Sequence, residues 1–159
     1  TVAANLRERR NVDAVHARGA EFAAGLRFGQ LRFDGSLALT DAAVEASGIS
    51  AALDSKRPAQ TPKFAASGTL TWRPRANWLL AATLRHVGAQ FEDDLESDLL
   101  PAATTLDMYA EVPLAGPFSL VLRAENLTGT EVVTRNQAGS MDLGAPRTVW
   151  AGVKLRLGQ

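Results

Sequence analysis

FSLVLRAE at residues 118–125 and TVWAGVKLRL at residues 148–157 are the two stretches that decide the fold. In each of them apolar residues alternate with polar ones, with Val121 as the exception. Because successive side chains of a β-strand point to opposite faces, each stretch predicts a strand with one apolar and one charged face. The apolar positions are Phe118, Leu120, Leu122 and Ala124 in the first stretch, and Val149, Ala151, Val153, Leu155 and Leu157 in the second.

The same alternation recurs along the rest of the chain, and patterns with a helical period are absent. It predicts about seven full strands and a partial one at Thr1–Arg9. The sequence therefore predicts an all-β fold. The full strands are expected at residues 16–28, 31–40, 63–73, 78–91, 105–114, 118–125 and 148–157.

The connections between these strands alternate in length. In an antiparallel meander, alternate connections lie at the same end of the sheet. One end would then carry only tight turns and the other only long polar loops, which is the layout of outer-membrane barrels. This asymmetry predicts an up-and-down transmembrane β-barrel meander. The short connections are residues 29–30, 74–77 and 115–117, and the long ones are residues 46–62, 93–103 and 135–146.

Aromatic residues lie next to the expected turns, as in the girdle of a membrane barrel. They are Trp72, Trp78, Phe28, Phe33 and Phe118. The same residues could close the bottom of a soluble barrel, because alternation alone does not say which face meets water. The charges within the strands fit either case, since they could line a polar lumen or an outer surface. They are Glu21, Arg27, Asp34, Arg85, Asp107, Glu111, Arg123 and Glu125.

Composition excludes several classes of protein. The chain has 159 residues, a formal net charge of zero and no cysteine, so a nucleic-acid footprint, a disulfide framework and a cysteine metal site are not expected. No apolar run reaches the ~20 residues of a transmembrane helix. His16 and His86 lie far apart and are expected at ordinary strand positions. The chain starts at Thr1 without a signal-peptide pattern, which suggests a fragment or a processed chain.

The loops contain the remaining candidate residues. The acidic run of residues 92–98 resembles a cation site in composition but lacks the spacing and glycine of a calcium loop, so a solvated surface loop is expected. Asn126 is expected to shape the chain near the rim, and Arg147 to form an ion pair within the barrel. Gly139, Gly144 and Pro146 are interpreted as loop geometry. No catalytic set of side chains stands out, so no enzyme, cofactor or metal is predicted.

Five segments together resemble the C-terminal barrel strands of TonB-dependent outer-membrane receptors. They occur in the right order and cover nearly the whole chain. Each segment alone is a loose match, whereas five in register are fairly specific. They are NVDAVHARGAE (11–21), LALTDAAV (37–44), NWLLAATLRHVGAQFEDD (77–94), RAENLTG (123–129) and GAPRTVWAGVKLRL (144–157).

The resemblance implies a barrel of about 22 strands with a plugged lumen. Residues 1–159 would supply roughly the last third of its wall and would lack the plug domain and the TonB box. It implies TonB-driven uptake of a scarce bulky solute, most often a ferric siderophore, and contact with outer-membrane lipid. It also implies recognition of the last strand by the barrel-assembly machinery. Such barrels usually end in an aromatic residue, whereas here Leu157 is followed by Gly158 and Gln159.

Two other architectures are compatible with the same strands. One is a self-contained eight-stranded barrel, either a small outer-membrane barrel or a lipocalin-like ligand carrier. It requires the first strand to be complete and to pair with the last. The other is a soluble β-sandwich binding module, in which two apolar faces would be buried against each other.

Overall fold

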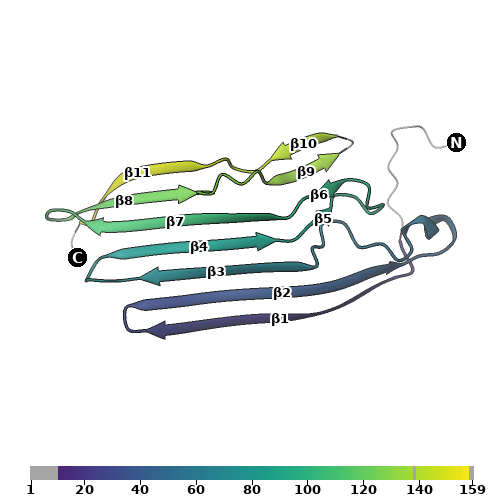
Figure 1. The fold of residues 1–159 in the computed structure, drawn as a ribbon, viewed down its shortest axis with the longest axis horizontal. Coiled ribbons are helices and arrows are strands. Elements are labelled where there is room, and N and C mark those ends of the chain that lie inside the picture. Colours follow the sequence, from purple (N-terminus) through teal and green to yellow (C-terminus); the bar gives the residue numbers. More distant parts are fainter. Residues whose placement is uncertain (1–10, 138, 158–159) are drawn as a thin grey trace.

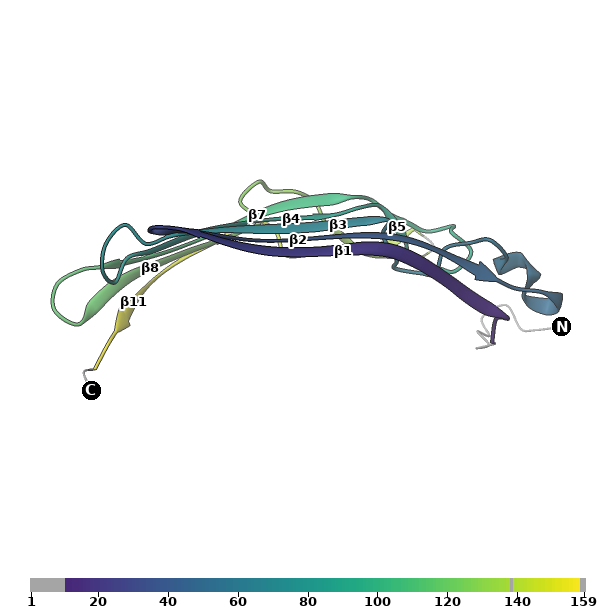
Figure 2. The same cartoon turned by 90° about the horizontal axis from the view of Figure 1, so that it is seen from below.

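The protein forms one curved antiparallel sheet in the computed structural model, which describes residues 11–137 and 139–157 (Figures 1 and 2). Seven strands pair in the order β1-β2-β3-β4-β7-β8-β11. They are β1 (Ala14–Phe28), β2 (Leu31–Glu45), β3 (Phe64–Trp72), β4 (Leu79–Val87), β7 (Ala103–Pro113), β8 (Phe118–Glu125) and β11 (Thr148–Leu155). The partial strand expected at Thr1–Arg9 lies outside the described residues.

The short and long connections segregate to opposite ends of the sheet. The turns after β1, β3 and β7 lie together on the left of Figure 1, and the connections after β2, β4 and β8 lie on the right. We call these the turn end and the loop end. Gly29 adopts a positive φ of 57° in the two-residue turn between β1 and β2, a conformation that glycine adopts without steric cost. The predicted asymmetry of the meander is confirmed.

The loop end is more ordered than the sequence suggested. It contains a short 3₁₀ helix η1 (Gly48–Leu53) and two small hairpins, formed by β5 (Gln90–Phe91) with β6 (Leu99–Leu100), and by β9 (Val133–Gln137) with β10 (Ser140–Leu143). In the described part, no helix is long and apolar enough to cross a membrane. Because β4 ends at Val87, the prediction of one continuous strand over residues 78–91 is wrong. The hairpin of β9 and β10 likewise contradicts the plain loop predicted over residues 135–146. Pairings of two to five residues are too short to give a readable alternation.

The strand register places like side chains side by side and gives the sheet two different faces. Leu80 pairs with Trp72 on one side and Ala110 on the other, whereas Thr83 pairs with Thr69 and Asp107. We call these the apolar face and the polar face. Many large apolar side chains are exposed to solvent, whereas among the described residues the buried apolar ones are Ala42, Val44, Ala46 and Leu100.

The two alternative architectures do not fit this sheet. Within the described residues, β1 and β11 are the free edges of an open sheet rather than partners, so the eight-stranded barrel does not close through them. In the described part of the chain no second layer covers the apolar face, where Phe22 is 63% and Val153 66% exposed. The β-sandwich prediction is therefore wrong, because a sandwich would bury these side chains.

The two faces of the β1–β2 hairpin change polarity where the hairpin extends beyond the other strands. On the apolar face, Ala20 pairs with Leu39, but the next pair on that face is Arg18 with Asp41. On the opposite face, Val44 is buried where the following loop returns and its backbone pairs with Ser55 and Lys56. The apolar band of the sheet thus ends between Leu39 and Asp41.

Gly19 lies at the position along β1 where the apolar band ends. A Cβ atom at this position would come within 2.1 Å of the carbonyl oxygen of Leu39. Only glycine therefore allows β1 and β2 to approach as closely as they do here.

Candidate functional site: the polar face and the loop end

Glu111 is the centre of an ionic cluster near the turn end of the polar face. Its side chain is buried, although it projects from β7 on a single-layered sheet. Lys154 Nζ lies 3.1 Å from Glu111 Oε2, and Arg156 Nη2 lies 2.5 Å from Glu111 Oε1. The Tyr109 hydroxyl donates to the same carboxylate at 3.1 Å, and Arg156 also donates to Asn77 Oδ1 at 3.2 Å. The carboxylate is therefore satisfied by two cations and a phenol.

Lys154 lies on β11 and Arg156 directly follows its last residue, so their side chains cross β8 to reach Glu111 on β7. The register places Val121 between Glu111 and Gly152 across the three strands. A valine on one strand and a glycine on the next leave room for the crossing side chains. This explains the one apolar residue that breaks the alternation of β8.

Further paired polar groups lie toward the middle and the loop end of this face. Arg85 Nη1 lies 2.5 Å from Asp107 Oδ2. Arg123 forms an ion pair with Glu125, and its guanidinium lies 5.5 Å from the ring centre of Trp150. Hydroxyl pairs extend the face toward β2: Ser36 with Ser67, and Thr69 with Thr83, each at 2.9 Å. The strand charges named here are paired on a polar wall, which is the arrangement expected for a wide hydrated lumen.

Asn126 shapes the chain at the end of β8, as predicted. It is buried and adopts a positive φ of 47°, which asparagine tolerates better than most residues. Its side-chain amide donates to the carbonyl of Thr130 at 2.7 Å and to that of Ala145 at 3.2 Å, and its Oδ1 accepts from Thr130 N at 2.9 Å. Its own N–H donates to Asp107 at 2.9 Å. One side chain thus connects the loop after β8 to the residues that precede β11.

Arg147 does not form the ion pair that the sequence suggested. In the described part of the chain, its guanidinium donates to the carbonyl of Thr128 at 3.4 Å. A Cβ atom at Gly129, where φ is +69°, would come within 2.6 Å of that guanidinium. Arg147 therefore packs over a tight turn. Gly139 has a φ of +84°, and Gly144 and Pro146 lie between β10 and β11, so these residues have the loop roles predicted for them.

Asp93 organises the acidic loop between β5 and β6. Its carboxylate accepts hydrogen bonds from the backbone N–H groups of Leu95, Ser97 and Asp98 at 3.0, 2.9 and 2.8 Å, and from the Ser97 hydroxyl at 2.9 Å. Burial would raise the pKa of Asp93, but these hydrogen bonds outweigh it and hold the pKa below its ordinary value of 3.8. Asp93 is therefore a local turn-former.

The other carboxylates of the acidic run join two loops. Glu96 accepts from Arg57 N at 3.0 Å and lies within 4.0 Å of Lys56 Nζ. Asp94 accepts from Ala59 N at 3.3 Å, and Glu92 accepts from Gln60 Nε2 at 3.2 Å. The run lies in a surface loop, as predicted, and the loop before β3 supplies partners for its carboxylates that the sequence did not indicate. In the described part of the chain, no three acidic or histidine side chains are grouped to hold a metal ion.

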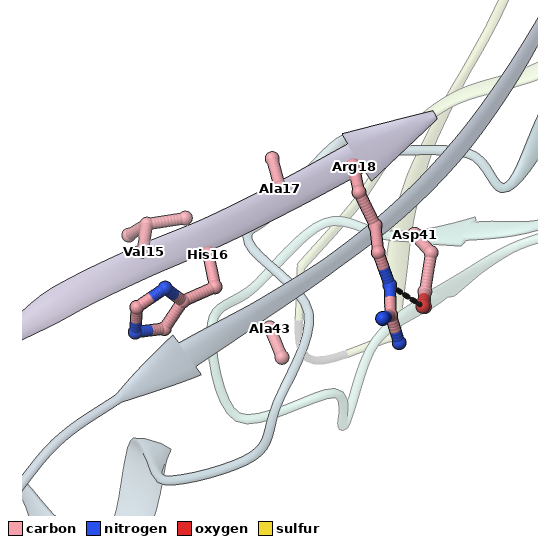
Figure 3. Close-up of a pocket in the computed structure, with 6 residues that line it drawn as sticks. All are labelled: Val15, His16, Ala17, Arg18, Asp41 and Ala43. Atoms are coloured by element: carbon pink, nitrogen blue, oxygen red, sulfur yellow. Dashed lines mark hydrogen bonds and ion pairs between the residues drawn. The ribbon is translucent and has the colours of Figure 1, made fainter. Parts of the chain in front are cut away.

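The two histidines lie on different strands and have different partners. His16 Nε2 lies 2.8 Å from Glu45 Oε2 beside a shallow hollow on the β1–β2 hairpin. Figure 3 shows His16, Arg18 and Asp41 on one side of this hairpin and Val15 on the other. His86 Nδ1 lies 2.8 Å from Thr104 Oγ1, and its ring lies against Phe64.

Sequence reasoning missed the contact between the two loops and the side chains that cross β8. Both depend on residues far apart in the chain, and opposite charge was the only available signal. Residues 56–57 are basic and residues 92–98 are acidic. Such complementarity cannot be distinguished from ordinary surface charge without a known distance between the loops.

Comparison with known proteins identifies the architecture. The family model described as TonB dependent receptor-like, beta-barrel matches residues 3–127. No curated protein matches the chain by sequence. Among solved structures, the ferric preacinetobactin receptor BauA of Acinetobacter baumannii is 22% identical with a TM-score of 0.73, over 87% of this chain and 22% of the receptor.

Two further receptors have the same fold. The siderophore receptor PiuA of Acinetobacter baumannii is 14% identical with a TM-score of 0.75, over 87% of this chain and 21% of PiuA. The ferric yersiniabactin uptake receptor FyuA of Yersinia pestis is 16% identical with a TM-score of 0.76, over 89% of this chain and 23% of FyuA. The chain spans less than a quarter of each receptor. It belongs to the family of TonB-dependent receptor-like β-barrels.

Proposed function

We propose that this chain is a wall segment of an outer-membrane receptor that imports a scarce, bulky solute, namely a ferric siderophore, with energy from TonB. The observation that carries the proposal is the polar wall of paired charges opposite an apolar outer face, capped by interacting loops. A wide hydrated lumen needs such a wall. The receptors with the same fold include ones named for ferric preacinetobactin and ferric yersiniabactin.

We further propose that residues 1–159 are the C-terminal part of the barrel. The chain corresponds to 21–23% of each of the three receptors compared above. A plug domain and a TonB box would then belong to the rest of the receptor. The barrel-assembly machinery would act on β11, which is a free edge strand. No covalent step is proposed, because binding and release of the solute need none.

Uptake of radioactive iron by cells that produce the full-length receptor tests this function. The gene is deleted from its host, and ferric catecholate, ferric hydroxamate and ferric citrate labelled with radioactive iron are offered separately, with radioactive copper ions as a fourth solute. We expect uptake of one ferric chelate to be lost on deletion, to return with the gene and to stop when an uncoupler collapses the proton gradient. Unchanged uptake of all four solutes after deletion would contradict the proposal.

A second measurement tests the assignment of the chain as part of a larger barrel. An antibody to residues 139–146 detects the native polypeptide in isolated outer membranes. We expect a band several-fold heavier than the 16.9 kDa of this chain. A band of the chain's own mass would contradict the proposed receptor.

A further inference from the structure

The apolar face contains a hollow that runs from the turn-end residues of β3 and β4 across β7 and β8 to the start of β11. Its lowest points are Ala82, Ala110 and Ala124, which lie diagonally next to one another in the register. Larger side chains surround them, among them Leu70, Met108 and Leu122, which are exposed. Short alanine side chains between long ones leave a groove on a face that otherwise projects leucine, valine and aromatic side chains.

A cation lies at the turn end of this groove. Trp72 and Leu80 line the groove and pair in the register. Trp78 directly precedes β4, and continuing the alternation of that strand places it on the apolar face. The Arg75 guanidinium lies 5.8 Å from the ring centre of Trp78 and is therefore on the same side. Among residues 11–137 and 139–157, Arg75 has no carboxylate partner. An arginine without a carboxylate next to an apolar groove is chemically suited to a molecule with an anionic head and an apolar tail.

We infer that this groove and Arg75 together bind one anionic phospholipid of the periplasmic leaflet. The short turns of outer-membrane barrels face the periplasm, so Arg75 lies at the depth of that leaflet's phosphate groups. The guanidinium donates to phosphate oxygens, and Trp78 lies at the interface where indole rings are favoured. From Trp78 to Ala82, β4 advances roughly 14 Å, which brings the first part of an acyl chain over the alanines.

This site differs from the general lipid contact of a barrel surface in having both a defined shape and a charge. Elsewhere on the apolar face, β1 has an alanine at Ala24, but the diagonal neighbour Phe33 is large. The nearest cation on that face of β1 is Arg18, which lies beyond Ala20 and forms an ion pair with Asp41. Ala24 therefore provides a matched control on the same face. The inference requires only that the chain lies in the outer membrane and does not depend on the transported solute.

Native mass spectrometry of the full-length receptor, extracted in mild detergent with added phosphatidylglycerol, tests the site. We expect one phosphatidylglycerol molecule to stay bound to the wild type. Two variants, Ala110→Leu, which fills the groove, and Arg75→Gln, which removes the cation, should each lose it. Ala24→Leu should retain it, and Arg75→Lys should retain part of it. Each variant is run on a gel before and after boiling. A boiled sample that migrates more slowly than the unboiled one shows that the variant had folded.

Selectivity for the headgroup is the second readout. In nanodiscs, brominated phosphatidylglycerol should quench Trp72 and Trp78 at a roughly fivefold lower fraction of lipid than brominated phosphatidylcholine, as one arginine–lipid contact predicts. The Trp72→Phe, Trp78→Phe double variant gives the signal to subtract. Equal quenching by the two lipids, or equal retention in Ala110→Leu and Ala24→Leu, would overturn the inference. Neither result would affect the proposed uptake.

Discussion

Asn126 is the residue whose loss should weaken the loop end most. Asn126→Ala removes four side-chain hydrogen bonds at a buried position: three to Thr130 and Ala145, and a longer one of 3.4 Å from the Thr128 hydroxyl. We expect the free energy of unfolding to fall by about 2–4 kcal/mol, at about 1 kcal/mol for each lost bond plus strain in the backbone. Thermal unfolding of the receptor in detergent measures the change.

Two further variants separate the causes of this effect. Glycine adopts a positive φ without strain, so Asn126→Gly should lower the free energy of unfolding less than Asn126→Ala does. Thr128→Ala is the control in the same loop. It removes only the 3.4 Å hydrogen bond to Asn126 Oδ1 and an exposed contact with the Thr130 hydroxyl, so it should lower the free energy of unfolding much less. Equal stability of Asn126→Ala and Thr128→Ala would show that the amide does not hold the loop.

Asp93 makes the acidic loop sensitive to low pH. Its folded pKa is below the ordinary 3.8, so its stabilising effect is complete above that value and is lost as the pH falls through the folded pKa. We expect the amides of Ser97 and Asp98 to exchange hydrogen faster, relative to an unstructured peptide, in this acid range. Asp93→Asn should remove this step between neutral and acid pH, whereas Asp54→Asn should keep it. A wild-type loop equally protected at pH 2 and pH 7 would contradict the prediction.

At the scale of elements, Glu111 connects the edge strand β11 to β7 across β8. Glu111→Gln leaves Lys154 and Arg156 without their common counter-charge. In the full-length receptor we expect roughly tenfold faster amide exchange along β11, since a strand opens locally more often when such contacts are lost. Glu125→Gln is the matched control, because Glu125 pairs with Arg123 on the same face. Unchanged exchange in Glu111→Gln would show that backbone pairing alone holds the edge.

The two faces of β4 should tolerate charge very differently. Leu84 is exposed on the apolar face, and its neighbour Thr83 faces Asp107 on the polar side. We expect Leu84→Arg to destabilise the folded barrel by about 2–4 kcal/mol, as for a cation near the middle of the bilayer. Thr83→Arg should be nearly neutral. Guanidinium unfolding in lipid vesicles measures both, and equal costs would contradict the assignment of the faces.

At the scale of the whole molecule, the open sheet predicts that the isolated chain aggregates. Two unpaired edges and an uncovered apolar face favour association with other chains. We expect residues 1–159, expressed without the rest of the receptor, to aggregate in buffer without detergent. Size-exclusion chromatography measures this. A sharp monomeric peak without detergent would contradict the single-layered wall described here.

The meander could be predicted from the sequence because its information is local. The alternation from Phe118 to Glu125 identifies both the strand and its two faces, and short turns identify the end at which strands reverse. The site could not be predicted in the same way. Glu111 meets Lys154, and Glu96 meets Arg57, only once the register and the loop paths are known. Each of those carboxylates looks in sequence like any other surface charge.

The extension of β1 and β2 beyond the apolar band affects which part of the receptor is exposed at the cell surface. Above Gly19 the hairpin projects past the lipid, with Arg18 and Asp41 on its outer surface and their side chains 88% and 62% exposed. The loop end of such barrels faces the surroundings. In the proposed receptor, an antibody to this ribbon would therefore bind living bacteria whether or not the receptor holds its solute.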